Sequence, residues 1–438
     1  MSIGFLSHVI ETKGLFHSIE RTLQVLLRYS FGRQRFTEMM EALEKGLGPI
    51  GVRVTFCVTG DLLESHHSFF ERFRDLGHEF AAHGYVHTNM KLKRLEEQCD
   101  LVEKSYAAFE KARLPVNGFR CPYLSYNGDT MAALGKSRFL WTSNNLILWD
   151  EGVNPKASYN RHMKKLGLLY NTSSHEVAIS LPSQAGKLID IPITAPDDEM
   201  LFERYRVKES SAITGVWSSI FEKIYSRGEL FHLLFHPERF RYFERTIKVL
   251  AEQAREKSPK VWFATLGEIT AWWERRQSSA WEIENTNGRA WLRLTAPPES
   301  AVLMKRTERQ HDDRSICGIY SVADMSMRDG YSCFETDDWK KHTIQLSNSC
   351  SPDVRRFLSE EGFIVTVEEE PHKEALLIDG YQRFGDNDRR PLLEMVEKAP
   401  YPLLRLWRWP YGAQCAFAIS SDVDSINVAD FFKRMLNF

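Results

Sequence analysis

The stretch GVRVTFCVTG, residues 51–60, decides the predicted fold. Its continuous apolar run ending in glycine predicts a buried strand. Apolar residues at helical spacing precede it between Phe36 and Leu47, and a second helical pattern follows around 69–73. Further strand candidates are HEFAAHG (78–84), VNGFRCPY (116–123), FLWTSN (139–144), LIDIPIT (188–194), ELFHLLFH (229–236) and VWFATL (261–266). Because strands and helices alternate from about residue 35 to 275, we expect an α/β fold with a parallel sheet, either open or closed into a barrel.

The pattern changes after Arg276. WEIENTNGRAWLRLTA, residues 281–296, places two alternating runs around Asn287-Gly288, which predicts a hairpin. Residues 352–380 predict a helix and two strands, and CAFAIS (415–420) predicts a last buried strand before an acidic loop and a short helix. We therefore expect four units, which are an α/β domain at 1–278, a small β-rich module at 279–345, a small α/β unit at 346–400, and a strand–acidic loop–helix at 401–438.

Composition and charge restrict the function classes. Of the 438 residues, 43% are hydrophobic and 26% charged, which is ordinary for a globular protein. The net charge of −2 gives no basic face for nucleic acid or an anionic membrane. No apolar run reaches the ~18 residues that suggest a membrane span, and the N-terminus lacks the basic region of a signal peptide. The seven cysteines include no C-x-x-C pair, so we expect reduced thiols in a cytoplasmic protein.

Three short segments at predicted strand ends carry reactive side chains. His83 and His87 lie four positions apart, and two imidazoles at this spacing can bind one divalent metal. Arg120 precedes a turn fixed by proline, and His236 ends an apolar strand. Taken singly, each segment also fits a structural role, namely a surface turn, a strand-terminating turn or a buried core histidine.

Taken together, the three segments favour an active site over three separate structural roles, because active sites of α/β folds gather at the ends of parallel strands. Two histidines with an open metal position fit metal-assisted hydrolysis. A third histidine would be the general acid, and an arginine would orient a carboxylate base. That carboxylate and a third metal ligand are missing from these segments.

The segments TFCVTG, HGYVH, RCPY and LLFHP, in this order and at these intervals, resemble the polysaccharide deacetylase family of carbohydrate esterases over residues 28–275. The resemblance implies a distorted (β/α) barrel and a divalent metal, usually zinc, held by an Asp-His-His set. Cobalt, nickel or iron would also suit such ligands. By position, it implies the metal ligands His83 and His87, the base-orienting Arg120, an oxyanion site at Pro122-Tyr123, the general acid His236, and Asp197 or Asp198 as the carboxylate that orients His236.

The aspartate pair that opens the family's pattern has no clear copy ahead of GVRVTFCVTG. GFLSHVIET (4–12) offers Glu11 as a metal ligand but has Val9 where the base is expected. At the other end of the chain, AFAISSDVDS offers Asp422 as base and Asp424 as metal ligand. We favour this second pair, which requires a circular permutation in which the last strand completes the barrel beside residues 51–60.

Three other interpretations of these residues stay open at this point. Glu11 could bind the metal in place of Asp424. Residues 401–438 could begin a second, truncated domain with vestigial aspartates. SSDVDS could also be a solvated loop or a helix cap, since Ser and Asp are common there.

The function implied by the resemblance is metal-dependent removal of an N-acetyl group from an acetamido sugar or glycan, in cytoplasmic glycan biosynthesis. One alternative is a deacylase of a non-sugar amide. Another is a degenerate, non-catalytic protein that binds glycan or acts as a scaffold. Residues 280–400 carry no motif with a chemical interpretation.

Overall fold

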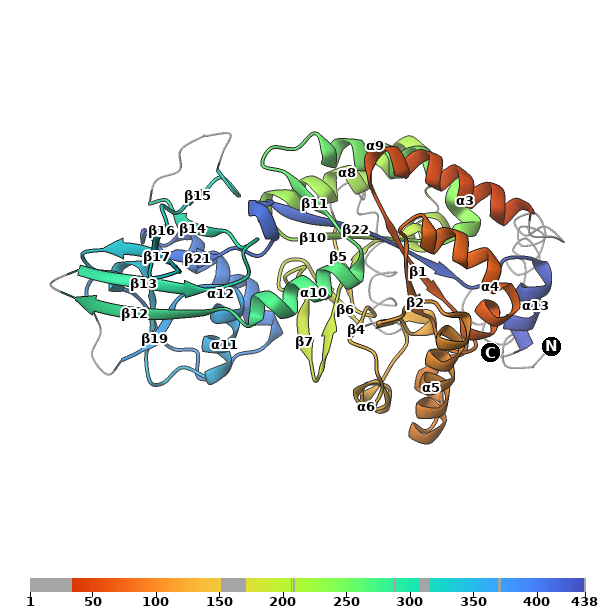
Figure 1. Ribbon diagram of the computed structural model, residues 1–438, viewed down its shortest axis with the longest axis horizontal. Helices are drawn as coiled ribbons and strands as arrows, with labels where there is room; N and C mark the ends of the chain where they lie inside the picture. Colours follow the sequence, from red (N-terminus) through yellow and green to blue (C-terminus); the bar gives the residue numbers. More distant parts are fainter. Residues whose placement is uncertain are drawn as a thin grey trace.

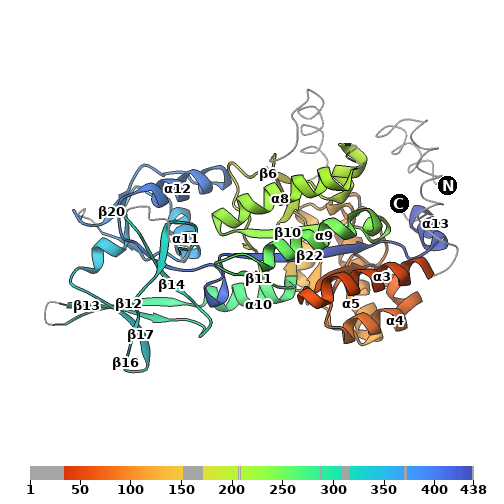
Figure 2. The same cartoon turned by 90° about the horizontal axis from the view of Figure 1, so that it is seen from above.

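The computed structural model describes residues 34–436, except 151–170, 206, 208, 287–288, 308–314 and 369–371. The described residues form a large lobe, built by 34–277 and 415–436, and a small lobe, built by 280–406. The two lobes lie at opposite ends of the molecule, and the strand β22 (Cys415–Val423) runs from their junction into the large lobe (Figures 1 and 2). Within the described residues, no helix combines the length and apolar character needed to cross a lipid bilayer.

The large lobe contains a curled, mainly parallel sheet, as the alternating pattern predicts. In spatial order its strands are β10 (Leu230–Phe235), β22, β1 (Val54–Val58), β2 (Glu79–Ala82), β3 (Gly118–Phe119), β4 (Trp141–Thr142), β8 (Leu188–Asp190) and the antiparallel β7 (Ser183–Ala185). β11 (Val261–Phe263) also pairs with β22. The predicted α/β class is confirmed, and the curled half-barrel sheet is consistent with the distorted (β/α) barrel that the resemblance implies.

Helices cover the sheet because each buries one apolar stripe. In α3 (Gln34–Leu47), for example, Phe36, Met40, Leu43 and Leu47 are buried, at the spacing of one helix face. The other helices of this lobe are α4 (Gly60–Asp75), α5 (Leu95–Ala112), α6 (Gly128–Lys136), α8 (Ser210–Arg227), α9 (Phe240–Arg255), α10 (Leu266–Gln277) and α13 (Val428–Leu436).

β22 lies in the middle of the sheet although it comes last among the strands in the sequence. It pairs in parallel with β10 through residues 416–421 on one side. On the other side it pairs first with β11 and then with β1. All nine residues of β22 are buried, so the segment after 414 is not the start of a separate domain.

The predicted strand LIDIPIT is two strands in different sheets. Leu188–Asp190 forms β8 of the main sheet, whereas Ile193–Ala195 forms β9. β9 belongs to a second parallel sheet with β5 (Leu146–Leu148) and β6 (Thr172–Ser174). Pro192 separates them, because proline has no N–H to donate to a ladder.

The small lobe contains three small sheets and two α-helices in its described residues. The predicted hairpin is present as β12 (Ala280–Thr286) and β13 (Arg289–Thr295), with its turn residues outside the described part. The other elements are β14 (Val302–Lys305), β15 (Tyr320–Val322), β16 (Ser326–Arg328), β17 (Tyr331–Thr336), β18 (Ile344–Leu346), α11 (Pro352–Glu360), β19 (Val365–Val367), β20 (Leu376–Ile378), α12 (Asp386–Lys398) and β21 (Leu404–Leu406).

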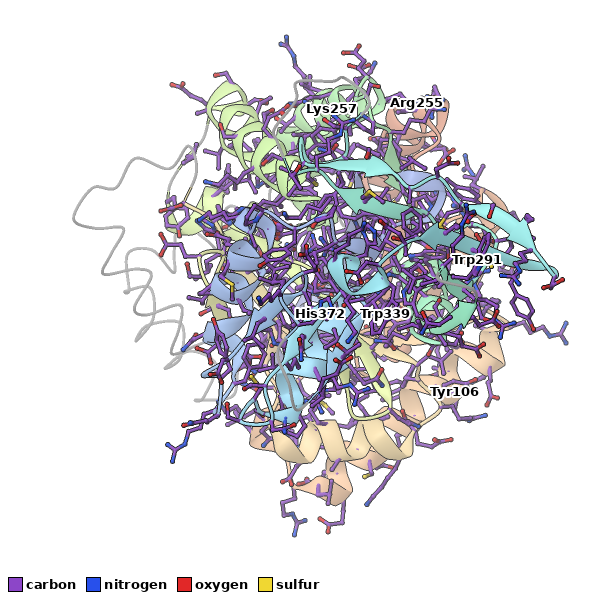
Figure 3. All side chains as sticks on the ribbon, turned by 90° about the vertical axis from the view of Figure 1, so that its left-hand side faces the viewer. Tyr106, Arg255, Lys257, Trp291, Trp339 and His372 are labelled. Carbon is purple, nitrogen blue, oxygen red and sulfur yellow. The ribbon has the colours of Figure 1, made fainter. Side chains whose placement is uncertain are left out.

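Aromatic and arginine side chains pair on the hairpin sheet of the small lobe. The Arg328 guanidinium lies 4.6 Å from the ring centre of Trp291, and that of Arg293 lies 4.5 Å from the ring centre of Tyr331. Figure 3 looks onto this end of the molecule and labels Trp291. These cation–π pairs cover large rings on the solvent side of the sheet.

A buried charged junction joins the lobes just ahead of β22. The Glu361 carboxylate accepts from Arg408 at 2.6 Å and also pairs with Arg405. Arg276 of α10 donates to the Trp407 carbonyl at 2.9 Å, and the Trp409 indole donates to the Gly228 carbonyl at 2.9 Å. The junction therefore fixes where the chain leaves the small lobe and enters the main sheet.

Candidate active site and metal centre

Five neighbouring strands end along one edge of the main sheet, and four of them are followed by candidate site residues. β10, β22, β1 and β2 are neighbours in this order, followed by β3. His236 follows β10, Asp424 follows β22, His83 follows β2 and Arg120 follows β3. Because carboxyl ends of parallel strands meet at one edge, these side chains converge although 341 positions separate His83 from Asp424 (424 − 83).

Two imidazoles and one carboxylate form the centre of this cluster. The Asp424 Oδ1 atom lies 3.3 Å from Nε2 of His83 and 3.3 Å from Nε2 of His87. One ligand atom from each of the three residues lies within 4.8 Å of the others. Two imidazole nitrogens and a carboxylate oxygen are the donor set of many catalytic zinc sites. The residues present therefore fit a divalent metal ion.

The orientation of His83 favours metal binding. Its Nδ1 atom is 3.0 Å from the backbone carbonyl of Arg120, which can only accept a hydrogen bond. The proton therefore lies on Nδ1, and the lone pair of Nε2 points toward the Asp424 carboxylate. Gly84, which follows, has a φ of +76°, and a Cβ there would lie 3.2 Å from Pro122 Cγ. This close approach brings the histidine turn against the turn after β3.

A buried ion pair adjoins His83, His87 and Asp424. Asp422, near the end of β22, is 4% exposed, and its Oδ1 accepts from Nη1 of Arg120 at 2.8 Å. Its other carboxylate oxygen lies 3.9 Å from Nε2 of His83. Asp424 is 9% exposed. The interpretation of SSDVDS as a solvated loop or cap is therefore wrong, because both carboxylates are buried at the sheet edge.

Arg120 is held by three further groups in the interior of the lobe. It donates to the Ser143 carbonyl at 3.0 Å, to the Ser143 hydroxyl at 2.9 Å and to the Ser420 hydroxyl at 2.8 Å. The Ser420 hydroxyl also contacts Nε2 of His232 at 2.8 Å. Burial and the Arg120 charge lower the pKa of His232 to about 3, so this imidazole is neutral. The guanidinium therefore has a fixed direction toward Asp422.

His236 pairs with one of the two predicted aspartates. Its Nδ1 atom lies 2.8 Å from Asp198 Oδ1, and its backbone N–H donates to Asp198 Oδ2 at 2.9 Å. Burial alone would raise the pKa of Asp198, but the His236 and Arg239 charges lower it. Asp197 instead accepts from the Met200 N–H at 2.8 Å, and burial with the adjacent Asp198 raises its pKa. The structure thus places Asp198, and not Asp197, against the imidazole.

The turn after β3 has a strained backbone beside the histidines. Tyr123 has a φ of +60°, which non-glycine residues rarely adopt. Its ring centre lies 4.3 Å from that of His87. Ahead of it, the Cys121 N–H donates to the Asn144 side chain at 2.7 Å. Such strain is often found where backbone groups are aimed at a functional site.

The structure brings together His83, His87, Arg120, Asp422 and Asp424, and Glu11 lies outside the described residues. Sequence analysis missed four contributors, namely Ser143, Asn144, His232 and Ser420. A signal for His232 exists, because strand alternation places it on the same side of the chain as His236. The serines and the asparagine carry no such signal, since their partners are distant in the sequence.

Residues 29–139 match the family model of the polysaccharide deacetylases, which confirms the resemblance over that segment. No curated protein sequence matches the chain. One similar solved structure is a candidate polysaccharide deacetylase from Mycobacterium smegmatis, 19% identical, with a TM-score of 0.41 over 53% of this chain and 76% of its own.

Two other similar structures are shorter matches. A family 4 carbohydrate esterase from Streptomyces lividans in complex with acetate is 20% identical, with a TM-score of 0.23 over 28% of this chain and 60% of its own. A pseudoenzyme of the same esterase family from Bacillus anthracis is 16% identical, with a TM-score of 0.25 over 42% of this chain and 57% of its own. This chain spans less than two thirds of the length of each.

Proposed function

We propose that this chain is a metal-dependent hydrolase that removes the acetyl group from an N-acetylated sugar. The observation that carries the proposal is the convergence of His83, His87 and Asp424 beside the Asp422–Arg120 pair. The match of residues 29–139 to polysaccharide deacetylases supports the same reaction class. A cytoplasmic location stays a prediction from the sequence.

In this proposal His83, His87 and Asp424 hold the metal. Zinc is our first choice, and cobalt, nickel or iron would suit the same ligands. When bound, such an ion polarises the amide carbonyl and lowers the pKa of water toward about 7. The permuted order supplies the Asp ligand from the last strand of the sheet, next to β1.

The remaining residues handle the protons. Asp422 takes a proton from the attacking water, whose oxygen bonds to the amide carbon, and Arg120 fixes the direction of this carboxylate. The backbone N–H of Tyr123 donates to the developing oxyanion. When the C–N bond breaks, His236 gives the leaving nitrogen a proton from Nε2, because Nδ1 faces Asp198. The products are acetate and an amino sugar.

Metal content and acetate release test the proposal on the same samples. Elemental mass spectrometry of the wild type, His87→Ala, Asp424→Ala and Glu11→Ala should give near one metal per chain, lost in the first two variants and kept in Glu11→Ala. Asp422→Asn should keep the metal and lose acetate release from N-acetylated oligosaccharides by at least about 100-fold.

Two outcomes would contradict the proposed site. Loss of metal in Glu11→Ala with retention in Asp424→Ala would move the third ligand to the N-terminal segment. A folded wild type that binds oligosaccharide without metal or acetate release would favour a non-catalytic binding protein.

A further inference from the structure

Three consecutive residues after β4 contact the segment that carries the proposed oxyanion donor. Ser143, Asn144 and Asn145 connect β4 of the main sheet with β5 of the second parallel sheet. The oxyanion turn, Pro122–Leu124, comes just after β3. Because β3 and β4 are paired parallel strands, the two segments leave the same edge of the sheet side by side.

The turn has a backbone conformation that its side chains disfavour. Tyr123 and Leu124 have φ values of +60° and +51°, and neither is glycine. Such consecutive left-handed residues persist only where the surrounding structure holds them. The bond from the Leu124 N–H to the Cys121 carbonyl, 2.9 Å long, closes the turn without fixing it to the sheet. Groups outside the turn must therefore hold it in place.

Asn144 holds the start of the segment 121–126, which contains the turn. Its Oδ1 atom accepts from the Cys121 backbone N–H at 2.7 Å, and its Nδ2 atom donates to the Thr142 hydroxyl at 2.5 Å. That hydroxyl donates in turn to the Phe119 carbonyl at 3.0 Å. Asn144 is buried, so water does not compete for these bonds. Since a backbone N–H can only donate, the amide oxygen of Asn144 is fixed toward Cys121.

Asn145 holds the other end of the segment. Its Oδ1 atom accepts from the Tyr126 hydroxyl at 2.6 Å, and its Nδ2 atom donates to Asp190 Oδ2 at 2.8 Å. Burial raises the pKa of Asp190 to about 6, so at pH 8 this carboxyl is ionised and can only accept. The amide oxygen of Asn145 therefore faces Tyr126. The Asn145 carbonyl also accepts from the Ile193 N–H at 2.8 Å, which ties this residue to the second sheet.

The residue before the two asparagines fixes the base-orienting arginine. Ser143 accepts from Arg120 through its carbonyl at 3.0 Å and through its hydroxyl at 2.9 Å. Arg120 also donates to Asp422, the proposed base, at 2.8 Å. Residues 143–145 thus hold three points of the segment 120–126, and they fix the oxyanion turn relative to the base.

We infer that Asn144 and Asn145 are positioning residues, which hold the segment 121–126 at both ends and so orient the Tyr123 backbone N–H toward the developing oxyanion. This inference rests on the proposed function, because the oxyanion donor and the base are proposals there. A preorganised donor stabilises the transition state because its direction is fixed before the reaction. Loss of either asparagine contact should therefore lower kcat and leave KM almost unchanged.

Acetate release at pH 8 tests the inference, with the zinc-loaded full chain and a β-1,4-linked tetramer of N-acetylglucosamine as substrate. Loss of an oxyanion donor costs about 10²- to 10³-fold in kcat, and a misdirected donor should cost less. We therefore expect kcat to fall about 10- to 100-fold in Asn144→Leu and about tenfold in Tyr126→Phe, with KM within about twofold. Asn144→Asp should recover kcat to within about fivefold, because it keeps an oxygen toward the Cys121 N–H and the Thr142 hydroxyl can donate to it.

Tyr225→Phe is the matched control for Tyr126→Phe. The Tyr225 hydroxyl also donates one hydrogen bond, to the Pro259 carbonyl at 2.7 Å, but it lies ahead of β10, at the opposite edge of the sheet from the site. Its loss should leave kcat within about twofold. Hydrogen–deuterium exchange follows the turn without turnover. Peptides covering 119–126 should exchange about tenfold faster in Asn144→Leu and Tyr126→Phe, while peptides of β1 exchange as in the wild type.

Three outcomes would overturn the inference. Wild-type kcat in Asn144→Leu and Tyr126→Phe, despite faster exchange of the turn, would remove the positioning role. Unchanged exchange in both variants would show that the asparagines do not hold the turn. A loss of kcat that Asn144→Asp does not recover, with faster exchange of β1 as well, would indicate a general structural defect. Failure of the proposed function is distinguishable, because it would appear as absent acetate release by the wild type, while exchange still shows whether the turn is held.

Discussion

Replacement of Arg120 by methionine should strongly destabilise the large lobe. The guanidinium is fully buried and donates to Ser143, Ser420 and Asp422. Its removal leaves the Asp422 carboxylate buried without its counter-charge. Breaking a buried ion pair from one side costs about 3–5 kcal/mol. Because whole domains are stable by only about 5–15 kcal/mol, urea unfolding of the chelator-treated protein should show a large decrease in its midpoint.

A double-mutant cycle separates charge from packing in this experiment. Asp422→Asn in the Arg120→Met background removes the uncompensated carboxylate, so the double variant should be more stable than the sum of the single effects predicts, by at least about 1 kcal/mol. Urea unfolding followed by tryptophan fluorescence and by far-UV circular dichroism should rank the stabilities of these variants in the same order. A loss below about 1 kcal/mol in Arg120→Met, or strict additivity in the cycle, would refute the reasoning.

Three further predictions follow from the same region. Since the folded pKa of His232 is about 3 and its ordinary value 6.5, only the unfolded chain binds this proton between those values, and stability should fall by up to about 5 kcal/mol as pH decreases through this window. His232→Gln should flatten the acid side of the melting-temperature profile, and an unchanged profile would contradict this. Asp198→Asn should lower kcat about 10- to 100-fold with little change in KM, because His236 loses the carboxylate that stabilises its protonated form; an equal effect on KM would indicate a binding role. Gly118→Ala should destabilise by about 1–3 kcal/mol in urea unfolding, since its Cβ would lie 1.9 Å from the Trp141 ring.

The sequence predicts the large lobe well because its strands are short buried runs between amphipathic helices. The exceptions have physical causes. Pro192 divides one apolar run between two sheets. Asp422 was predicted in a loop, yet β22 continues through Val423, because β1 pairs with it as far as that residue and satisfies its backbone groups. Local propensity cannot report a partner strand that lies more than 350 positions away.

The sequence predicts only some residues of the candidate site. His83, Arg120 and His236 follow predicted strands, and active sites of α/β folds gather at strand ends. The sequence pattern therefore indicates these three residues directly. The sequence alone leaves Asp422–Asp424 and Glu11 open, because tertiary structure decides which carboxylate reaches His83. The structure places Asp424 beside His83, and Glu11 lies outside the described residues, so the assignment stays a proposal. The network behind Arg120 escaped prediction, since Ser143, just after β4, and Ser420, within β22, carry no pattern that indicates contact with a guanidinium.

The central position of β22 has a consequence for how the chain folds. During synthesis, β1 and β10 emerge long before the strand that pairs with both of them. Until it arrives, each has an unpaired backbone edge, the kind of surface that promotes association with other chains. Contacts of such high sequence separation also slow folding. We therefore expect a nascent chain that stops before residue 415 to engage chaperones or aggregate, and its large lobe to close only after the small lobe has been synthesised.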